Sequence, residues 1–161
     1  MHRTIPELVF SDDPVSCLPI IRAIWCETNA GSLGLEYEGP IVDLMLLQYS
    51  AKMAQYQTQY PNLQQRIAYF QKKTSGYIMW SLENDQLVVV DIAVLTAYQR
   101  KGIATELLQQ CIKTANQNKK NVRLTVTRDN PAMSLYQRMG FTIVRSNDVH
   151  HQMQCDLPKI G

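Results

Sequence analysis

The sequence lacks long apolar runs, and its net charge is small. No stretch approaches the roughly 20 apolar residues that a membrane-spanning helix needs, and the first ten residues lack the apolar core of a secretion signal. Sixteen basic residues against fourteen acidic ones leave a net charge of +2, and the basic residues are dispersed. We therefore expect neither a membrane partner nor a nucleic-acid partner, and the expected location is cytoplasmic.

Cysteine pairs and metal-binding spacings are also missing. The four cysteines form no C-x-x-C pair, and no spacing in the sequence brings four zinc ligands together. The adjacent His150 and His151 would point to opposite faces of a strand, so they could not share one ion. We therefore expect no metal. Cys111 lies on an apolar helix stripe and is predicted to be a small buried hydrophobe.

What is present suits a single α/β domain. Of the 161 residues, 45% are apolar and 19% are charged, which is typical of a globular protein long enough to bury a core. There is no repeat and no linker. Apolar periodicity and turn signals predict helices at 15–28, 41–60, from about 102 to 115 and in the segment after Pro131, and strands at 4–10, 65–70, 76–82, 87–94, 122–127, 141–144 and 150–155. The strand, helix, strand order between 87 and 127 implies two parallel neighbours.

The segment 99–104, with the sequence Gln-Arg-Lys-Gly-Ile-Ala, lies between an apolar strand and a long amphipathic helix. The first N–H groups of that helix have no intrahelical partners, and the helix dipole places partial positive charge there. Gly102 allows close approach to the backbone, while Arg100 and Lys101 add two cations, unless they are ordinary surface charges. A ligand that carries phosphate is the first hypothesis.

A second pattern follows the strand at 122–127. Asn130 is a candidate N-cap, Pro131 suits a first helical turn, and Gly140 would end the short helix. The residues that share one apolar face of this helix are Ala132, Leu135, Tyr136 and Met139. We therefore predict that Tyr136 points inward, where it is either a functional group or only part of the core.

The helix at 41–60 carries two neighbouring stripes. Leu44, Leu47, Ala51 and Ala54 form the stripe predicted to face the core, and Met45, Tyr49, Met53, Tyr56 and Tyr60 form a stripe of larger side chains. The second stripe has two interpretations. It packs at the edge of the core, or its residues Tyr49, Met53 and Tyr56 form a wall of an acceptor pocket, because ligand sites are mostly apolar and aromatic.

The spacing Gln99-x-x-Gly102-x-Ala104 after a strand, followed by Asn130-Pro131-Ala132-x-x-Leu135-Tyr136-x-x-x-Gly140-Phe141, resembles the GNAT superfamily of acyl-CoA-dependent N-acyltransferases. The two motifs span 87–141, and residues 41–61 also resemble a bacterial GNAT subgroup of undefined acceptor. The resemblance implies a single GNAT domain over 1–161, of the α/β (α+β) class. Its mixed central sheet of six to seven strands would be splayed at its middle and flanked by about four helices. Residues 1–85 would form the acceptor-side half, 86–145 the acyl-CoA-binding core, and 146–161 the C-terminal strand.

The resemblance also implies roles for individual residues. The residues that match Gln99, Arg100, Lys101, Gly102, Ile103 and Ala104 hold the pyrophosphate of coenzyme A, and Thr105 continues the helix start. Those that match Ile92, Ala93 and Val94 hydrogen-bond the pantetheine arm as if it were another strand. The residue matching Asn130 contacts the cofactor, and the tyrosine matching Tyr136 lies beside its sulfur as a general acid. Many members have glycine where this chain has Ala104, and cofactor binding is still expected.

The general base is open. Asp91 is a conspicuous carboxylate in an apolar strand and is expected on the side opposite to Val90 and Ile92. It either activates the amine or has a buried, hydrogen-bonded structural role. Glu83 is a second candidate and is predicted to be a solvated turn residue. Water or a backbone carbonyl can also serve.

The implied activity is transfer of an acetyl group from acetyl-CoA, as co-substrate, to a primary amine. The amine of a small molecule or protein would attack directly in a ternary complex, with Tyr136 as general acid. The alternative is a GNAT fold that binds acyl-CoA for regulation or assembly without turnover. Residues 1–85 resemble the family too loosely to name the acceptor, and a second copy of the chain, as a homodimer, is a further candidate partner.

Overall fold

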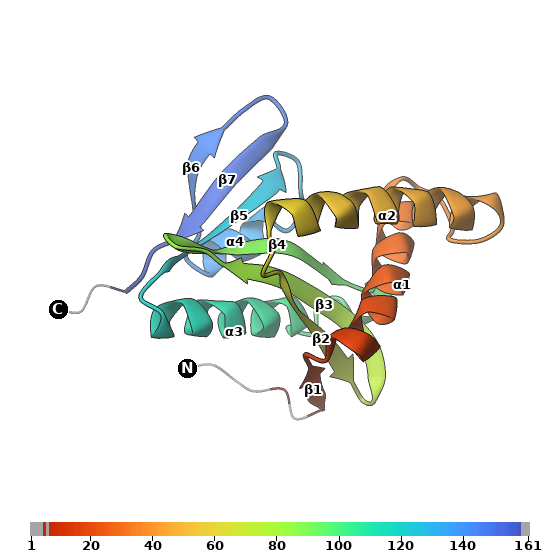
Figure 1. The fold of residues 1–161 in the computed structure, drawn as a ribbon, viewed down its shortest axis with the longest axis horizontal. Helices are drawn as coiled ribbons and strands as arrows, with labels where there is room; N and C mark the ends of the chain where they lie inside the picture. The colour runs from red at the N-terminus through yellow and green to blue at the C-terminus, as the bar shows by residue number, and fades with distance from the viewer. Residues whose placement is uncertain (1–4, 6, 159–161) are drawn as a thin grey trace.

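The computed structural model describes residues 5 and 7–158, which form a seven-stranded sheet with helices on both faces (Figure 1). The strand order is β1-β2-β3-β4-β5-β7-β6, with strands at Leu8–Ser11, Gln64–Phe70, Lys73–Leu82, Gln86–Val94, Asn121–Thr127, Thr142–Ser146 and His150–Cys155 for β1 to β7. The helices of this described part are α1 Pro14–Ser32, α2 Pro40–Gln59, α3 Ile103–Gln117 and α4 Met133–Arg138, with a 3-10 turn η1 at Thr96–Tyr98. The predicted mixed sheet with about four helices is confirmed. The first strand begins later than expected, and positions 4 and 6 lie outside the described residues.

Two hydrophobic clusters hold the helices against opposite faces of the sheet. The first lies under α3 and α4 and includes Leu107, Leu108 and Phe141. The second lies under α1 and α2 and includes Ile21 and Met45. The predicted apolar stripe of α3 consists of Ala104, Leu107, Leu108, Cys111, Ile112 and Ala115. Leu107, Leu108, Cys111 and Ala115 are buried, as predicted, whereas Ala104 and Ile112 are half-buried. Burial also raises the pKa of the Cys111 thiol to about 12, as suits a residue that behaves as a hydrophobe.

On α2 the two predicted stripes exchange roles. Met45, Tyr49 and Met53 are buried, whereas Leu44 and Leu47 are 42% and 70% exposed. The prediction that Leu44, Leu47, Ala51 and Ala54 face the core is therefore wrong, since Ala51 and Ala54 are exposed as well. The physical reason is the position of α2, which packs chiefly on α1 and not directly on the sheet. Only long side chains such as methionine and tyrosine bridge that distance.

The sheet opens between β4 and β5. These two parallel strands pair only from Gln86 with Asn121 to Val89 with Leu124. Beyond that point β4 stays paired with β3, and β5 stays paired with β7 as far as Thr127. The last residues of β4 therefore face a gap on their β5 side, which confirms the predicted splay at the middle of the sheet. None of the helices among the described residues has the length and apolarity that crossing a bilayer requires.

A β-bulge in β4 decides where its polar residue points. Val89 pairs with Trp80 and Asp91 pairs with Met79, which leaves Val90 as the extra residue. Val90 packs in the α1–α2 cluster, Asp91 bonds to a side chain of that cluster, and Ile92 packs on the α3 side. The prediction that Asp91 lies opposite Ile92 is correct, but the prediction that it lies opposite Val90 is wrong. The bulge breaks the simple alternation on which that prediction rested.

Candidate functional site

The loop that leads into α3 has the geometry of an anion-binding site. Gly102 is the N-cap of α3 and has a φ of 84°, and Arg100 has a φ of 64°. A glycine N-cap has no side chain with which to occupy the first N–H groups of the helix, so these face outward with the positive end of the dipole. The side chains of Arg100 and Lys101 are exposed beside them. The loop thus combines backbone donors with two neighbouring cationic residues, which suits a phosphate.

Two neighbours fix the position of this loop. The side-chain amide of Gln99 donates a hydrogen bond to the carbonyl oxygen of Val94 at 3.1 Å, which ties the loop to the end of β4. The ammonium group of Lys101 lies 5.5 Å from the ring centre of Phe70, at the end of β2. Phe70 in turn packs edge-on against Tyr98, with ring centres 6.1 Å apart. The loop is therefore held by contacts to the two strands on either side of β3.

A groove runs from the first turn of α3 between α3 and α4. Its lining residues are Thr105, Gln109, Ile112, Leu135, Arg138 and Met139. Thr105 thus lies in the first turn of α3 and lines this groove. Ile103 is only 1% exposed and Ala104 is half-buried, so these two can serve a ligand through their backbone N–H groups and not through their side chains. Arg138, which sequence reasoning did not single out, adds a cation to the rim of the groove.

The end of β4 borders the gap in the sheet. Ile92 and Val94 pack toward α3, and Ala93 packs toward α1 and α2. On the β3 side the chain is fixed, and the N–H of Leu95 donates to the carbonyl oxygen of Ser75 at 2.9 Å. On the β5 side no strand pairs with residues 90–94 within the described part. This backbone edge is free to pair with an extended ligand.

Asn130 and Tyr136 lie on the other side of the gap. Helix α4 begins at Met133, so its N-cap is Ala132 and not Asn130. The side-chain oxygen of Asn130 accepts a hydrogen bond from the N–H of Ala132 at 2.8 Å and caps the turn that precedes the helix. Tyr136 is 6% exposed, as predicted, and its ring packs edge-on against Phe141 at 6.1 Å. Burial, with a smaller contribution from the charge of Asp91, raises the pKa of Tyr136 to about 12.

Asp91 receives a hydrogen bond from a residue that the sequence did not single out. The hydroxyl of Tyr77, on β3, donates to Oδ2 of Asp91 at 2.7 Å, and Tyr77 has no exposed surface. Burial raises the pKa of Asp91, while the Tyr77 hydroxyl, the N–H of Ile92 and the positive charge of Lys52 oppose that rise. From the sequence alone, a tyrosine in an apolar strand is expected to be a core residue. Only the hydrogen bond to Asp91 identifies Tyr77 as a neighbour of the candidate site. Glu83 lies in the β3–β4 turn, as expected.

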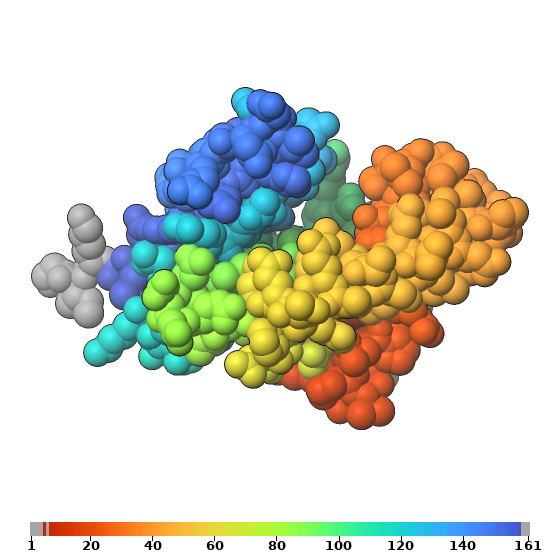
Figure 2. Space-filling view, turned by 45° about the horizontal axis from the view of Figure 1, so that its top comes forward, coloured from red at the N-terminus to blue at the C-terminus, as the bar shows by residue number. Residues whose placement is uncertain are grey.

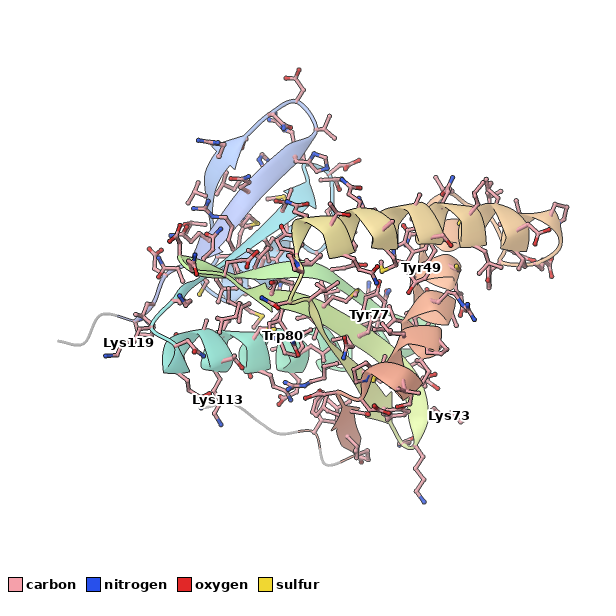
Figure 3. The ribbon with its side chains drawn as sticks, viewed as in Figure 1. Tyr49, Lys73, Tyr77, Trp80, Lys113 and Lys119 are labelled. Carbon is pink, nitrogen blue, oxygen red and sulfur yellow. The ribbon has the colours of Figure 1, made fainter. Side chains whose placement is uncertain are left out.

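Three residues of α2 form one wall beside Asp91. Tyr49 and Met53 are buried and Tyr56 is half-buried, on the side of α2 that faces the sheet. Figure 3 shows Tyr49 and Tyr77 between α2 and the sheet. Burial raises the pKa of both Tyr49 and Tyr56, and the charge of Asp91 adds to both shifts. Lys52 places its ammonium group 5.2 Å from the ring centre of Tyr56.

The opposite wall is a polar surface on β5 and β7. The residues on this face of the two strands are Arg123, Thr125, Thr127, His150, Gln152 and Gln154, in cross-strand pairs. Arg123 donates to the side-chain oxygen of Gln154 at 2.6 Å. Helices α1 and α2 cover only the β2–β4 half of this face, and Figure 2 shows the molecule hollowed between them (orange) and the β6–β7 hairpin (blue). The cleft thus has one aromatic wall and one polar wall.

The structure brings most of the predicted site residues to the gap between β4 and β5. The anion-binding loop and Tyr136 lie on the α3–α4 side, and Asp91 with Tyr49, Met53 and Tyr56 lies on the α1–α2 side. This arrangement can accept an extended, phosphorylated ligand where the sheet opens. The family model described as "Acetyltransferase (GNAT) domain" matches residues 43–155, and the chain belongs to that family.

Two curated relatives are similar to part of the chain. The N-alpha-acetyltransferase of Saccharolobus solfataricus is 35% identical over 94 residues, which cover 49% of this chain and 56% of that protein. The N-alpha-acetyltransferase of Sulfurisphaera tokodaii is 39% identical over 85 residues, covering 44% of this chain and 51% of that protein. The chain therefore spans about half the length of the curated relatives that it matches.

A solved structure supports the fold over nearly the whole chain. The PaiA N-acetyltransferase of Thermoplasma acidophilum, crystallised in complex with coenzyme A, superposes with a TM-score of 0.73. The match covers 92% of this chain and 98% of that one, at 17% sequence identity. This likeness confirms the fold that the motifs predicted.

Proposed function

We propose that the protein is an acetyl-CoA-dependent N-acetyltransferase that acts on the free α-amine of a peptide or protein. The observation that carries this proposal is the position of the loop at 99–104. It presents the N-terminus of α3 beside the place where β4 and β5 separate. One extended ligand can therefore bind the helix with its phosphates and enter the sheet with its thioester.

The chain offers suitable partners for the pyrophosphate and the pantetheine arm of coenzyme A. The N–H groups of 102–105 and the charges of Arg100 and Lys101 suit the pyrophosphate. The free edge of Ile92, Ala93 and Val94 suits the amides of the pantetheine arm, and Asn130, in the turn after β5, would contact the cofactor from that side. Gly102 leaves room for a ligand at the loop. A Cβ atom added to Gly102 would meet one described neighbour beyond the adjacent residues, Ile5 Cδ1 at 3.4 Å. The groove between α3 and α4 continues from there past Arg138.

Each chemical step has a residue in reach of the gap. Asp91 accepts one proton from the acceptor ammonium group, and the neutral amine then attacks the thioester carbonyl carbon to form the new C–N bond. As the C–S bond breaks, Tyr136 donates its proton to the departing thiolate, and the second proton lost by the acceptor nitrogen restores the tyrosine hydroxyl. The raised pKa of Tyr136 keeps that proton in place at neutral pH. Because a thiolate is a good leaving group, positioning of the two reactants contributes more than the acid does.

The choice of an α-amine rests on two observations. Both curated relatives are named N-alpha-acetyltransferases. In addition, an α-amine has a pKa of about 8, compared with about 10.4 for a lysine side chain, so a carboxylate base has less work to do at neutral pH. The cleft between α2 and the β5–β7 surface would receive the acceptor, with Tyr49, Met53 and Tyr56 against its first residue.

A panel assay separates this proposal from its competitors. The protein is incubated with acetyl-CoA and pentapeptides that begin with Met, Ser or Ala, with the same peptides blocked at the α-amine but carrying a lysine, and with spermidine. Coenzyme A release and the mass of each product are measured, and calorimetry measures coenzyme A binding.

We expect acetylation of at least one peptide with a free α-amine and of none of the blocked peptides. Turnover of spermidine or of lysine alone would refute the acceptor class. Tight coenzyme A binding without any turnover would favour the alternative of a non-catalytic acyl-CoA-binding protein.

A further inference from the structure

The contact between Tyr77 and Asp91 joins β3 to β4, the strand that borders the gap. Tyr77 lies on β3, where it pairs with Ala93, one of the residues that we propose to hold the pantetheine arm. Its hydroxyl is fully buried and donates to Oδ2 of Asp91 at 2.7 Å. Asp91 itself is only partly buried. The tyrosine therefore reaches the carboxylate from inside the protein, and Asp91 as a whole stays half-buried on the part of β4 that borders the gap.

The bulge at Val90 makes this contact possible. Without the extra residue, strand alternation would place Asp91 on the same face as Val89, among the apolar side chains under α3. The bulge turns Asp91 to the face of Tyr77 and Met79, and the tyrosine hydroxyl then fixes the direction of the carboxylate. A carboxylate has about four lone-pair sites, so the bond to Tyr77 leaves others for a substrate.

Ionisable groups from several elements surround this pair. Lys52, Tyr49 and Tyr56 approach from α2, Tyr77 from β3 and Tyr136 from α4. Lys52 is the cation among them, and its ammonium group already lies over the ring of Tyr56. An ammonium ion next to aromatic faces and a carboxylate is therefore already present in this site. The incoming amine would find the same partners.

We propose that Tyr77 is a positioning residue, which holds the Asp91 carboxylate toward the acceptor amine and keeps it ionised so that it can take the proton. This inference rests on the proposed function, because it assigns a partner to the base of the same reaction. Tyr77 does not touch the reacting atoms. It acts through one carboxylate oxygen of Asp91, and the proton that leaves the acceptor nitrogen goes to a lone pair that Tyr77 does not occupy.

The variant Tyr77→Phe removes the hydroxyl and keeps the ring in the core. Because the lost hydrogen bond favoured the ionised carboxylate, the pKa of Asp91 should rise, by about one unit for one hydrogen bond of ordinary strength. The acidic limb of the kcat/KM profile, measured with the best pentapeptide of the panel, should move to higher pH by the same amount. At pH values well below the limb this gives a loss of roughly tenfold, and above the limb the loss should be small.

A second measurement reports on Asp91 without turnover. The titration of its carboxyl carbon is followed by carbon-13 NMR in wild type and in Tyr77→Phe, with the signal assigned by its absence in Asp91→Asn. The control is Tyr69→Phe, which removes a hydroxyl from β2 in the same α1–α2 cluster without the bond to Asp91. Tyr69→Phe should leave both the titration and the pH profile unchanged.

The outcomes separate the inference from the function on which it rests. Matching upward shifts in the titration and in the acidic limb support it. A shifted titration with an unshifted limb would show that Asp91 is not the base, and an unshifted titration would show that Tyr77 does not tune it; either overturns the inference while the enzyme stays active. Wild-type protein with no turnover would refute the proposed function itself. If Tyr77→Phe fails to fold, 3-fluorotyrosine incorporated at position 77, a stronger donor, should move both readouts to lower pH.

Discussion

A Cβ atom on Gly76 would lie 2.7 Å from the carbonyl oxygen of Ala93 and 3.1 Å from Cγ2 of Val94. Gly76 is the β3 partner of Val94, so the two strands approach each other here more closely than any side chain allows. This close approach fixes the last residues of β4 against β3. The same residues present their other edge to the gap, where we propose that the pantetheine arm binds.

We therefore predict that Gly76→Ala displaces the end of β4. The clash is with backbone and cannot be relieved by a rotamer change, so we expect a loss of about 1–3 kcal/mol in the free energy of unfolding, together with weaker coenzyme A binding. Denaturant unfolding and calorimetry measure the two effects. The control is Gly31→Ala in α1, where no described atom lies within 4 Å of the added Cβ and alanine should be neutral or stabilising by about 0.5–1 kcal/mol. Unchanged coenzyme A affinity in a folded Gly76→Ala would separate this strand contact from cofactor binding.

The loop before α3 provides a second prediction. Gly102→Glu places a carboxylate at the site proposed for the pyrophosphate and forces a non-glycine residue to a φ of 84°. Coenzyme A binding, measured by calorimetry, should be abolished by charge repulsion and steric conflict. The backbone strain alone costs about 1–2 kcal/mol.

Gly34→Glu is the matched control for that strain. Gly34 has a φ of 73° in the α1–α2 loop, and no described atom lies within 4 Å of its Cβ position. It should lose similar stability and bind coenzyme A normally. Comparable losses of binding in both variants would mean that strain, and not the anion site, explains the effect of Gly102→Glu.

Tyr136→Phe tests the general acid. Removing the proton donor should lower kcat by about 10- to 100-fold, at the low end for acid catalysis because a thiolate leaves readily. Because the pKa of Tyr136 is raised to about 12, the wild-type enzyme should show no loss of activity from tyrosine ionisation up to about pH 10. Tyr98→Phe, in η1, is the control. If kcat is the same in Tyr136→Phe and wild type across the pH range, Tyr136 is a core residue only.

Much of the fold follows from local signals in the sequence. The amphipathic pattern of α3 and the glycine before it were sufficient to place that helix, because the pattern has a single apolar face. The same method failed on α2, where both candidate faces are apolar. The choice between Leu47 and Met45 as the inward residue depends on how far α2 stands from the sheet, and that distance is set by α1. Periodicity contains no information about it.

The site divides in the same way. The loop at 99–104 and Tyr136 belong to contiguous motifs, so residue types and spacing were enough to predict a functional role for them. Tyr77 is separated from Asp91 by thirteen intervening residues, and their contact depends on the bulge at Val90. A bulge is one extra residue in an otherwise ordinary apolar strand, and its composition does not distinguish it. Contacts that depend on strand register thus stay beyond the reach of a single sequence.

The assignment of the inward face of α2 can be tested by stability. Met45→Ala removes a fully buried side chain and should lower the free energy of unfolding by about 2–5 kcal/mol. Leu47→Ala removes a side chain that is 70% exposed and should change it by less than about 0.5 kcal/mol. Urea unfolding of the two variants measures the difference. A larger loss for Leu47→Ala would indicate that this face of α2 is covered in solution.

Asp91→Asn should stabilise the protein while it disables the proposed base. Burial raises the pKa of Asp91 in the folded state above its ordinary value of 3.8, so the folded chain binds more protons than the unfolded chain as pH rises above that value. Folding stability attributable to Asp91 therefore falls with rising pH, by about 1.4 kcal/mol for each unit of raised pKa. An asparagine does not ionise, and its side-chain oxygen can still accept the hydroxyl of Tyr77. The midpoint of thermal unfolding of Asp91→Asn should exceed that of wild type at pH 8, and the difference should shrink as pH falls toward 4.

The control is Asp85→Asn, which changes an exposed residue in the β3–β4 turn. Its free energy of unfolding should stay within about 0.5 kcal/mol of the wild-type value. If Asp91→Asn is instead less stable than wild type at pH 8, the bonds from Tyr77 and Ile92 outweigh the cost of burying the charge, and Asp91 is primarily structural.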